Sequence, residues 1–397
     1  MPTMDNDPVV IVGAARTPMG GFQGDFASLA ASDLGAVAIK AAVERAGVKP
    51  GDVDKAIVGC VLPAGQGQAP ARQAALKAGL PVSVGCTTVN KMCGSAMEAT
   101  MLAHDALLAG TADVIVAGGM ESMSNAPYLL PKSRSGYRMG HQQVIDHMFY
   151  DGLEDAYDKG RLMGTFAEDC ASKYEFTRAQ QDEFATGSLS RALAANNDGT
   201  FAWEIAPVTV STRKGDVVID KDEQPAKAVP EKIPTLKPAF RKEGTVTAAN
   251  SSSISDGAAA LVLMRRSHAE RMGLRPLAVI VGHATHAQEP AWFSTAPVGA
   301  IEKLYRKSGW TTKDVDLFEI NEAFAVVAMA AMKEHELPRD KVNVHGGACA
   351  LGHPIGASGA RIIVTLLGAL RAQHKKRGVA ALCIGGGEAT AIGIEVV

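Results

Sequence analysis

The order of structural elements repeats along the chain, and this repeat constrains the fold more than any other feature. In the first and last thirds, a glycine turn that holds a reactive side chain is followed by a long helix, a strand and another glycine turn. The helix and strand are predicted over 94–109 and 113–117 in the first third, and over 358–373 and 379–384 in the last. The shared order indicates an internal duplication. Alternating strands and helices favour an α/β fold with a mostly parallel sheet.

Other segments fit the same plan. The continuous apolar run 8–15 is typical of a strand buried on both faces. Residues 32–46 show helical periodicity, with Ser32 or Asp33 as the N-cap and Gly47 at the end. Three more strands are predicted over 55–60, 315–319 and 341–344, and one more helix over 323–334.

The middle of the chain, residues 122–243, departs from this pattern. It contains several aromatic residues, a stretch rich in lysine and proline over 221–238, and one clear helix over 178–196. So long a segment without periodicity is usually a functional lid or a binding region.

Composition excludes several classes of function. The chain has 397 residues, 47% of them hydrophobic and 21% charged, which is ordinary for a globular enzyme of two or three domain-sized units. The net charge of −2 offers no electrostatic case for nucleic acid or an anionic membrane. No apolar run reaches 18 residues, and residues 1–8 lack the hydrophobic core of a secretory signal. We therefore expect a cytoplasmic protein with no nucleic-acid or membrane partner.

The cysteines argue against a disulfide framework and a zinc site. No two form Cys-x-x-Cys, and no spacing of cysteine and histidine is typical of a metal site. The ordinary interpretation of each is a reduced, buried thiol in a cytoplasmic protein. The six are Cys60, Cys86, Cys93, Cys170, Cys349 and Cys383.

Cys93 lies in a predicted strand–turn–helix segment. It follows residues 86–91 and precedes Gly94-Ser95-Ala96, so it lies where a helix begins. A helix N-terminus lowers the pKa of a thiol, and a neighbouring glycine lets a substrate approach the backbone. A buried thiol in a tight turn is the alternative, but position, glycine and helix start together favour a nucleophile.

Two further reactive side chains lie in glycine-rich turns near the end of the chain. Pro354 prevents a helix through His353, so the imidazole is presented from a loop, where it suits a general base that deprotonates a thiol. Cys383 ends a predicted strand before three glycines, whose N–H groups could stabilise an oxyanion. A cysteine packed under the turn is the alternative for Cys383.

Two asparagine-containing turns admit two interpretations each. Asn321 either caps the helix predicted over 323–334 or holds a water at a reacting carbonyl. Residues 250–257 are predicted as a turn and a helix start, which either cap that helix or offer hydroxyl and N–H groups to a ligand.

Together these motifs resemble the thiolase family, and within it the acetyl-CoA acetyltransferases. The resemblance covers almost the whole chain and is carried, in this order, by residues 89–95, 321–325, 352–359 and 383–387, with support from 118–124 and 244–257. It implies a duplicated, five-layered α/β/α/β/α fold with an inserted loop domain. The implied units are an N-terminal domain (1–122 plus 246–273), a loop domain over the CoA site (123–245) and a C-terminal domain (274–397).

The resemblance also implies a reaction, the reversible Claisen condensation of two acetyl-CoA to acetoacetyl-CoA and CoA through an acetyl-cysteine. Cys93 would accept the acetyl group while His353 takes its proton, and Cys383 would move the Cα proton. Asn321, through a water, and His353 would form one oxyanion hole, and the N–H groups of Cys93 and Gly385 the other. The implied substrate-binding residues are Met163, Lys227, Ala248, Ser252, Phe293 and Phe324.

Further implications concern cofactors, assembly and specificity. No metal and no cofactor beyond the CoA thioester substrates is expected, and the assembly would be a homotetramer or a homodimer. Leu162 stands where many members have histidine, and Trp292-Phe293 where some have Val-Met, which reshapes the acyl pocket. No arginine lies near residues 224–225 for the CoA nucleotide, so Lys227, Lys232 or Lys237 would serve there.

Three rival functions stay open at this point. A longer-chain 3-ketoacyl-CoA thiolase would have the same residues and a wider pocket. A ketoacyl-carrier-protein synthase normally lacks the second cysteine, so Cys383 argues against that class. A non-catalytic carrier or scaffold protein with the same fold would have no reason to retain all four reactive side chains.

Overall fold

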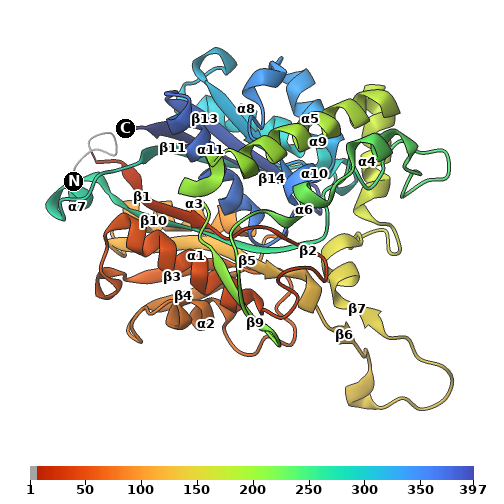
Figure 1. The fold of residues 1–397 in the computed structure, drawn as a ribbon, viewed down its shortest axis with the longest axis horizontal. Coiled ribbons are helices and arrows are strands. Elements are labelled where there is room, and N and C mark those ends of the chain that lie inside the picture. Colours follow the sequence, from red (N-terminus) through yellow and green to blue (C-terminus); the bar gives the residue numbers. More distant parts are fainter. Residues whose placement is uncertain (1–6) are drawn as a thin grey trace.

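The computed structural model describes residues 7–397, and most of the 1–8 segment considered above lies outside this range. A large mixed sheet runs through the molecule in two halves (Figure 1). The strands of the first half are β1 (Val9–Arg16), β3 (Lys55–Gly59), β4 (Gly85–Val89), β5 (Val114–Ser122) and β10 (Ser255–Arg265). Those of the second half are β11 (Ala278–Ala287), β12 (Leu317–Ile320), β13 (Arg377–Ile384) and β14 (Glu388–Val396). In Figure 1, β1, β3, β4 and β5 of the N-terminal half are drawn in red to orange, and β13 and β14 of the C-terminal half in blue.

The two halves have the same strand order. In the first half the order in space is β4-β3-β5-β10-β1, which is 3-2-4-5-1 when strands are numbered along the chain. In the second half the order is β12-β13-β14-β11, and an isolated parallel bridge between Phe318 and Val342 stands where strand 3 would pair with β12. A short contact between β1 and β11, at Val10–Val279 and Ile11–Ala278, joins the halves.

The helices complete five layers. The central layer consists of α3 (Ser95–Leu108) and α11 (Ser358–Ala372), which share one apolar cluster with both halves of the sheet. On the outer faces, α1 (Ala31–Ala46) and α2 (Pro70–Lys77) cover the first half, and α8 (Ala296–Ser308) and α9 (Ala325–Glu334) the second. The prediction of a duplicated, five-layered α/β fold is confirmed.

Burial of the sheet on both faces explains the apolar runs in the sequence. Along β1, Val10 and Val12 pack in the outer cluster while Val9 and Ile11 pack in the central one. Each successive side chain therefore enters a core, because neighbouring residues of a strand point to opposite faces. The helix α11 is buried from Ser358 to Leu370 on every side, as expected of a helix between two sheets.

Several local predictions are wrong. The sheet is not mostly parallel: among the labelled strands of the described residues, β3–β4, β3–β5 and β12–β13 pair in parallel, and the other pairs of this sheet are antiparallel. Residues 341–344 form a turn and the single bridge at Val342 instead of a strand. The segment 250–257 leads into strand β10, not into a helix. Ala30, not Ser32 or Asp33, is the N-cap of α1, although the Asp33 carboxylate accepts the Ala30 N–H at 3.0 Å.

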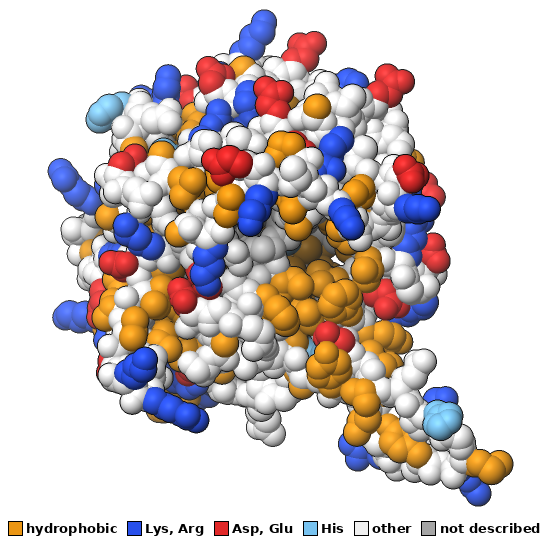
Figure 2. All heavy atoms as spheres, turned by 45° about the vertical axis from the view of Figure 1, so that its right-hand side comes forward, with side chains coloured by type: hydrophobic (Ala, Val, Ile, Leu, Met, Phe, Trp, Pro, Cys, Tyr) orange, Lys and Arg blue, Asp and Glu red, His pale blue; other side chains and the backbone are white. Residues whose placement is uncertain are grey.

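The segment between β5 and β10 is more ordered than its composition suggests. The predicted helix is present as α5 (Arg178–Asn197), and α4 (Met163–Tyr174), which the sequence analysis missed, precedes it. Its other elements are β6 (Tyr128–Leu129), β7 (Ile145–Asp146), β8 (Val208–Thr212), β9 (Gly215–Ile219) and α6 (Glu223–Lys227). The part around β6 and β7 projects from the body and carries exposed hydrophobic side chains (Figures 1 and 2). The proposed boundaries of the three domains stay a prediction.

The remaining strand is β2 (Gly20–Gly21), and the remaining α-helices are α7 (Arg266–Arg271) and α10 (Ala348–Leu351). Within residues 7–397, no helix has both the length and the apolar character needed to cross a membrane.

Candidate active site

A strained turn presents Cys93 between β4 and α3. Met92, just before it, has a positive φ of 47°, which a non-glycine residue adopts only when its surroundings enforce it. Ser95 supplies that enforcement, because its hydroxyl donates to the Met92 carbonyl at 2.6 Å and accepts the Lys91 N–H at 2.9 Å. The turn thus has the sharp strand-to-helix geometry that exposes a nucleophile.

The Cys93 thiol is not acidified in this state. Burial raises its pKa to about 11, and the N–H groups of Gly385 and of Cys93 itself only partly oppose this effect. The expectation that the helix start lowers this pKa is therefore wrong, because desolvation outweighs the helix terminus. A thiol with this pKa is protonated near neutral pH, so it needs a neighbouring base to become a nucleophile.

His353 is a neutral imidazole with one free nitrogen. Its Nδ1 lies 2.6 Å from the Ser358 hydroxyl, which itself donates to the Pro354 carbonyl at 3.0 Å. The hydroxyl is therefore the acceptor, Nδ1 carries the proton, and Nε2 is left with a lone pair. Nε2 is buried and has no hydrogen-bond partner among residues 7–397. Burial and the charge of Arg361 lower the pKa of His353 to about 3, so it stays neutral.

Asn321 is oriented by a buried arginine. It directly follows β12, and its Oδ1 accepts from Arg361 at 3.3 Å, which directs its Nδ2 toward the imidazole of His353, 3.4 Å away. The second distance is at the outer limit for a hydrogen bond, so the shorter contact to Ser358 decides the tautomer of His353. Phe324, not Asn321, is the N-cap of α9, so capping does not explain Asn321.

Cys383 lies next to the Cys93 turn. It is the penultimate residue of β13 and is fully buried, and burial, together with the neighbouring Cys93, raises its pKa well above the ordinary value. Gly94 lets the two segments approach, because a Cβ there would lie 2.3 Å from the Ile384 side chain. The Gly385 N–H, two residues after Cys383, is directed at the Cys93 sulfur.

Three of the predicted substrate-binding residues surround Cys383. Phe293 and Phe324 are buried in one apolar cluster with Cys383, and Met163 packs against it from the start of α4. The Phe293 ring meets Phe166 edge-on with 6.2 Å between centroids. Both of its predicted roles, packing residue and pocket wall, are compatible with this position.

The other three predicted substrate-binding residues lie at or beside a separate cavity of about 400 Å³. Lys227 and Ala248 line it, together with Lys232, whereas Ser253 lines it instead of the predicted Ser252. The Lys227 ammonium forms an ion pair with Glu223, and its side chain is largely exposed. Ser252 is half-buried and is fixed by its backbone N–H, which donates to the Ala323 carbonyl at 2.9 Å.

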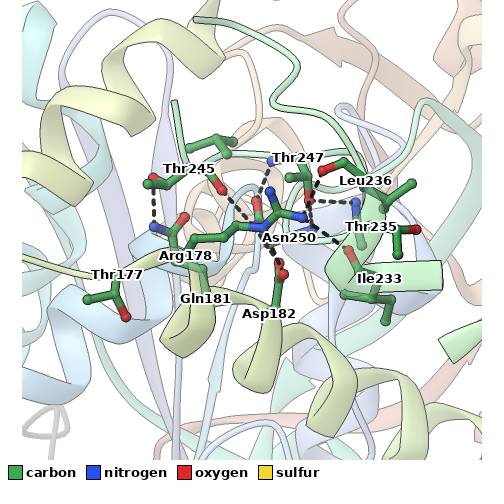
Figure 3. A network of polar contacts seen from close by, with 12 residues as sticks. Thr177, Arg178, Gln181, Asp182, Ile233, Thr235, Leu236, Thr245, Thr247 and Asn250 are labelled. Carbon is green, nitrogen blue, oxygen red and sulfur yellow. Dashed lines mark hydrogen bonds and ion pairs between the residues drawn. The ribbon is translucent and has the colours of Figure 1, made fainter. Parts of the chain in front are cut away.

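A polar network holds the walls of this cavity in place (Figure 3). The Arg178 guanidinium donates to Asp182 at 2.7 Å and to the carbonyls of Ile233 and Leu236 at 3.1 and 2.9 Å. On the other side, Asp182 accepts from the Asn250 amide at 3.1 Å. Through Arg178, the Asp182 carboxylate on α5 is thus connected to residues 233–236, and it contacts the loop before β10 directly. Both segments line the cavity.

Comparisons with known proteins decide the family. The family model of the thiolase N-terminal domain matches residues 9–267, and that of the C-terminal domain matches residues 274–396. The chain belongs to the thiolase family. This thiolase is 53% identical to acetyl-CoA acetyltransferase 2 of Arabidopsis thaliana, over 98% of this chain and 97% of the relative. It is 51% identical to the acetyl-CoA acetyltransferase of Cupriavidus necator, over 98% and 99%.

Solved structures agree with this assignment. The thiolase superimposes on the acetyl-CoA acetyltransferase of Bacillus anthracis with a TM-score of 0.96 and 42% identity, covering 98% of this chain and 99% of the other. Against the Acat5 thiolase of Ascaris suum in complex with coenzyme A, the TM-score is 0.93 with 43% identity, covering 98% and 100%.

Three residues of the thiolase site escaped the sequence analysis. Ser358 and Arg361 lie one turn apart on α11. Ser358 contacts His353, and Arg361 contacts Asn321. Glu121 on β5 accepts three backbone N–H groups at 2.9 to 3.1 Å, those of Val61, Leu62 and Gly356. The available signal for Arg361 was an arginine near the start of the mostly apolar helix 358–372, whose other charged residue, Arg371, lies in the last turn.

Proposed function

We propose that this thiolase is an acetyl-CoA C-acetyltransferase that interconverts two acetyl-CoA with acetoacetyl-CoA and CoA. The observation that carries the proposal is a pair of neighbouring thiols, the half-buried Cys93 and the buried Cys383. The loop of His353 packs against Cys93 through Ile355, and within residues 7–397 the Nε2 of His353 has no hydrogen-bond partner. Two thiols divide the reaction, because one must hold the acyl group while the other handles the proton of a second acetyl group.

The first half-reaction forms the acetyl-enzyme. His353 Nε2 takes the proton of Cys93, whose sulfur attacks the carbonyl carbon of acetyl-CoA. The carbon–sulfur bond to CoA then breaks, and the leaving CoA thiolate takes the proton back from His353. This assignment follows from the tautomer set by Ser358, since only Nε2 has a lone pair available.

In the second half-reaction, the Cys383 thiol first gives its proton to the neutral His353, and the Cys383 thiolate then removes the Cα proton of another acetyl-CoA. The resulting carbanion attacks the acetyl carbon on Cys93, and the leaving Cys93 thiolate takes the proton back from His353, giving acetoacetyl-CoA. A strongly raised pKa suits Cys383 for this role, because its thiolate is a strong base and its thiol a proton donor in the reverse direction.

Fixed donors would stabilise the two oxyanions, so the reaction needs no metal and no cofactor beyond its CoA substrates. The N–H groups of Cys93 and Gly385, which converge on the Cys93 sulfur, suit the carbonyl oxygen of the acetyl group once it is attached there. The Asn321 amide, through a water, and His353 would serve the thioester oxygen of the second acetyl-CoA. Met163, Phe293 and Phe324 would enclose the acyl end.

The cavity lined by Lys227 and Ala248 is the proposed site for part of CoA. Its lysines, Lys227 and Lys232, offer positive charge to the nucleotide phosphates, and Ser252 with Ser253 offers polar groups along the way. A homotetramer or homodimer is the proposed assembly, supported by the exposed hydrophobic residues on the projecting segment, including Tyr128, Leu130 and Met139 (Figure 2). Six unpaired cysteines support a cytoplasmic location.

A spectrophotometric thiolysis assay tests the function. We expect the highest kcat/KM with four-carbon acetoacetyl-CoA and a decline for six-carbon and eight-carbon 3-ketoacyl-CoA substrates. Comparable efficiency with the eight-carbon substrate would instead indicate a longer-chain 3-ketoacyl-CoA thiolase. Absence of thiolysis with all three substrates would reject the proposal.

A further inference from the structure

Three metal-ligating side chains converge on the side of the molecule where α3 meets β11. His104 and Asp105 are neighbours in the last turns of α3, and His283 lies on β11, in the other half. His283 Nε2 is 3.2 Å from His104 Nδ1 and 2.9 Å from Asp105 Oδ1, and His104 Nδ1 is 3.0 Å from the same Oδ1. The three atoms form a nearly equilateral triangle.

Protons cannot satisfy all three edges of this triangle when both imidazoles are neutral. If His104 and His283 both donate to Asp105, the edge between the histidines brings two N–H groups together. If His283 donates to His104 instead, the lone pairs of His104 and Asp105 face each other. One contact is therefore always between like groups, because each neutral imidazole nitrogen is either a donor or an acceptor.

A divalent cation above the plane of these three atoms would satisfy all three contacts. Ligand bonds of about 2.1 Å at right angles place neighbouring donor atoms about 3.0 Å apart, which is the spacing found here. The triad of His104, Asp105 and His283 lines a cavity of about 600 Å³, which leaves room for water molecules to complete the coordination. Two imidazoles and one carboxylate suit first-row transition metals such as Ni²⁺, Co²⁺ and Zn²⁺ better than Mg²⁺ or Ca²⁺.

Two cations face the same region and oppose metal binding. Lys307 lines the cavity, but its ammonium is held by the His283 carbonyl at 2.9 Å. Arg265 is paired with Asp7 at 3.2 Å. Both therefore already have oxygen partners, and the exposed Asp105 carboxylate adds a negative charge directly at the triad.

We propose that His104, Asp105 and His283 bind one divalent transition-metal ion that fastens α3 to β11. The consequence is structural, because α3 begins beside the nucleophile Cys93 while the triad lies near its other end. The ion would hold the central helix, which carries the nucleophile turn, against the half of the sheet that supplies Cys383. This inference does not depend on the proposed acetyltransferase activity.

Calorimetric titration with Ni²⁺ tests the proposal on full-length enzyme whose Cys93 has first been alkylated with iodoacetamide, since a free active-site thiol also binds the metal. Wild type should bind one equivalent, and Ni²⁺ should raise its Tm. His283→Ala and Asp105→Asn should each weaken binding by about tenfold or more. Asp105→Asn alters an exposed side chain, so it separates loss of the site from a folding defect.

His374→Asn is the matched control, because it removes an exposed histidine whose left-handed backbone suits asparagine. This variant should bind Ni²⁺ like wild type. All three unalkylated variants should keep wild-type thiolysis without metal, since none lies in the active site. Equal Ni²⁺ affinity in wild type, His283→Ala and Asp105→Asn, or no saturable binding by wild type, overturns the proposal.

Discussion

The two halves of the molecule share one topology but place different chemistry at matching positions. In each half the loop before the central helix carries a reactive group, Cys93 before α3 and His353 before α11. In the proposed reaction, one fold unit therefore presents the nucleophile and its copy presents the base. Neither half holds a complete site, so the reaction depends on the face where the halves meet.

The strand ends extend this comparison. Gly59 of β3 pairs with Gly119 of β5, and Ile320 of β12 pairs with Ala381 of β13. Cys60 directly follows Gly59, and Asn321 directly follows Ile320. Glu121 lies two residues after Gly119, and Cys383 lies two residues after Ala381. By register, Cys60 therefore matches Asn321 and Glu121 matches Cys383.

These matched pairs have different roles. Burial raises the pKa of Glu121 to about 7, and its carboxylate accepts the N–H groups of Val61, Leu62 and Gly356, which fixes the loop that contains His353. The Cys60 sulfur lies 3.6 Å from the Glu121 carboxylate, and burial and that charge strongly raise its pKa. The first half thus uses these positions as a support, whereas in the proposed reaction the second half uses them for chemistry.

Replacing the two catalytic thiols in turn gives the largest expected effect. Cys93→Ala should form no acetyl-enzyme from acetyl-CoA and show no turnover, because the acyl acceptor is missing. Cys383→Ala should still acetylate Cys93 but lose about 10²–10⁴-fold in turnover, the usual loss of a general base. Intact-protein mass spectrometry measures the adduct and a thiolysis assay the rate. Near-normal turnover of Cys383→Ala, or acetylation of Cys93→Ala at the active site, contradicts these roles.

The matched positions Asn321 and Cys60 give the next largest contrast. Asn321→Ala should lower kcat by about 10²–10³-fold, the loss typical of one oxyanion donor. Cys60 lies at the equivalent position and is as buried as Asn321. Because the Cys60 thiol contacts Glu121 and other groups that only support the site, Cys60→Ala should keep kcat within about twofold of wild type. Steady-state kinetics with acetoacetyl-CoA compares the two variants. Equal losses of kcat would mean that the halves do not differ in the way proposed here.

The comparison also shows what the sequence could and could not predict. The reactive turns and the central helices were predictable, because glycine, proline and apolar periodicity act locally. The antiparallel pairing of β10 with β1 and β5 was not, since a strand buried on both faces has the same apolar run in either direction. In the second half, the counterpart of β4 consists of one bridge at Val342, although the sequence of residues 341–344 is typical of a strand.

The contacts that hold the site residues in place could not be predicted from the sequence either. Ser358 and Arg361 act on His353 and Asn321 only because the fold brings α11 beside the end of β12. The pKa of Cys93 shows the same limit. A helix start predicts a lowered value, but burial between the two halves, which only the structure reveals, raises it to about 11.

The smallest expected effect concerns Phe293, which belongs to the second half and is proposed to limit the acyl end beside Cys383. The ring is buried against Phe166, so Phe293→Leu is preferred to alanine because it keeps most of the packing. Each extra methylene that fits an apolar pocket contributes about 0.8 kcal/mol, or roughly fourfold, whereas a clash costs about 1–3 kcal/mol. Phe293→Leu should therefore narrow the gap in kcat/KM between four-carbon and six-carbon substrates by about fourfold to tenfold. Phe26→Leu, at a buried ring in the outer cluster of the first half, should lower stability without changing that ratio. If both variants leave the ratio unchanged, Phe293 is a packing residue and the chain-length limit lies elsewhere.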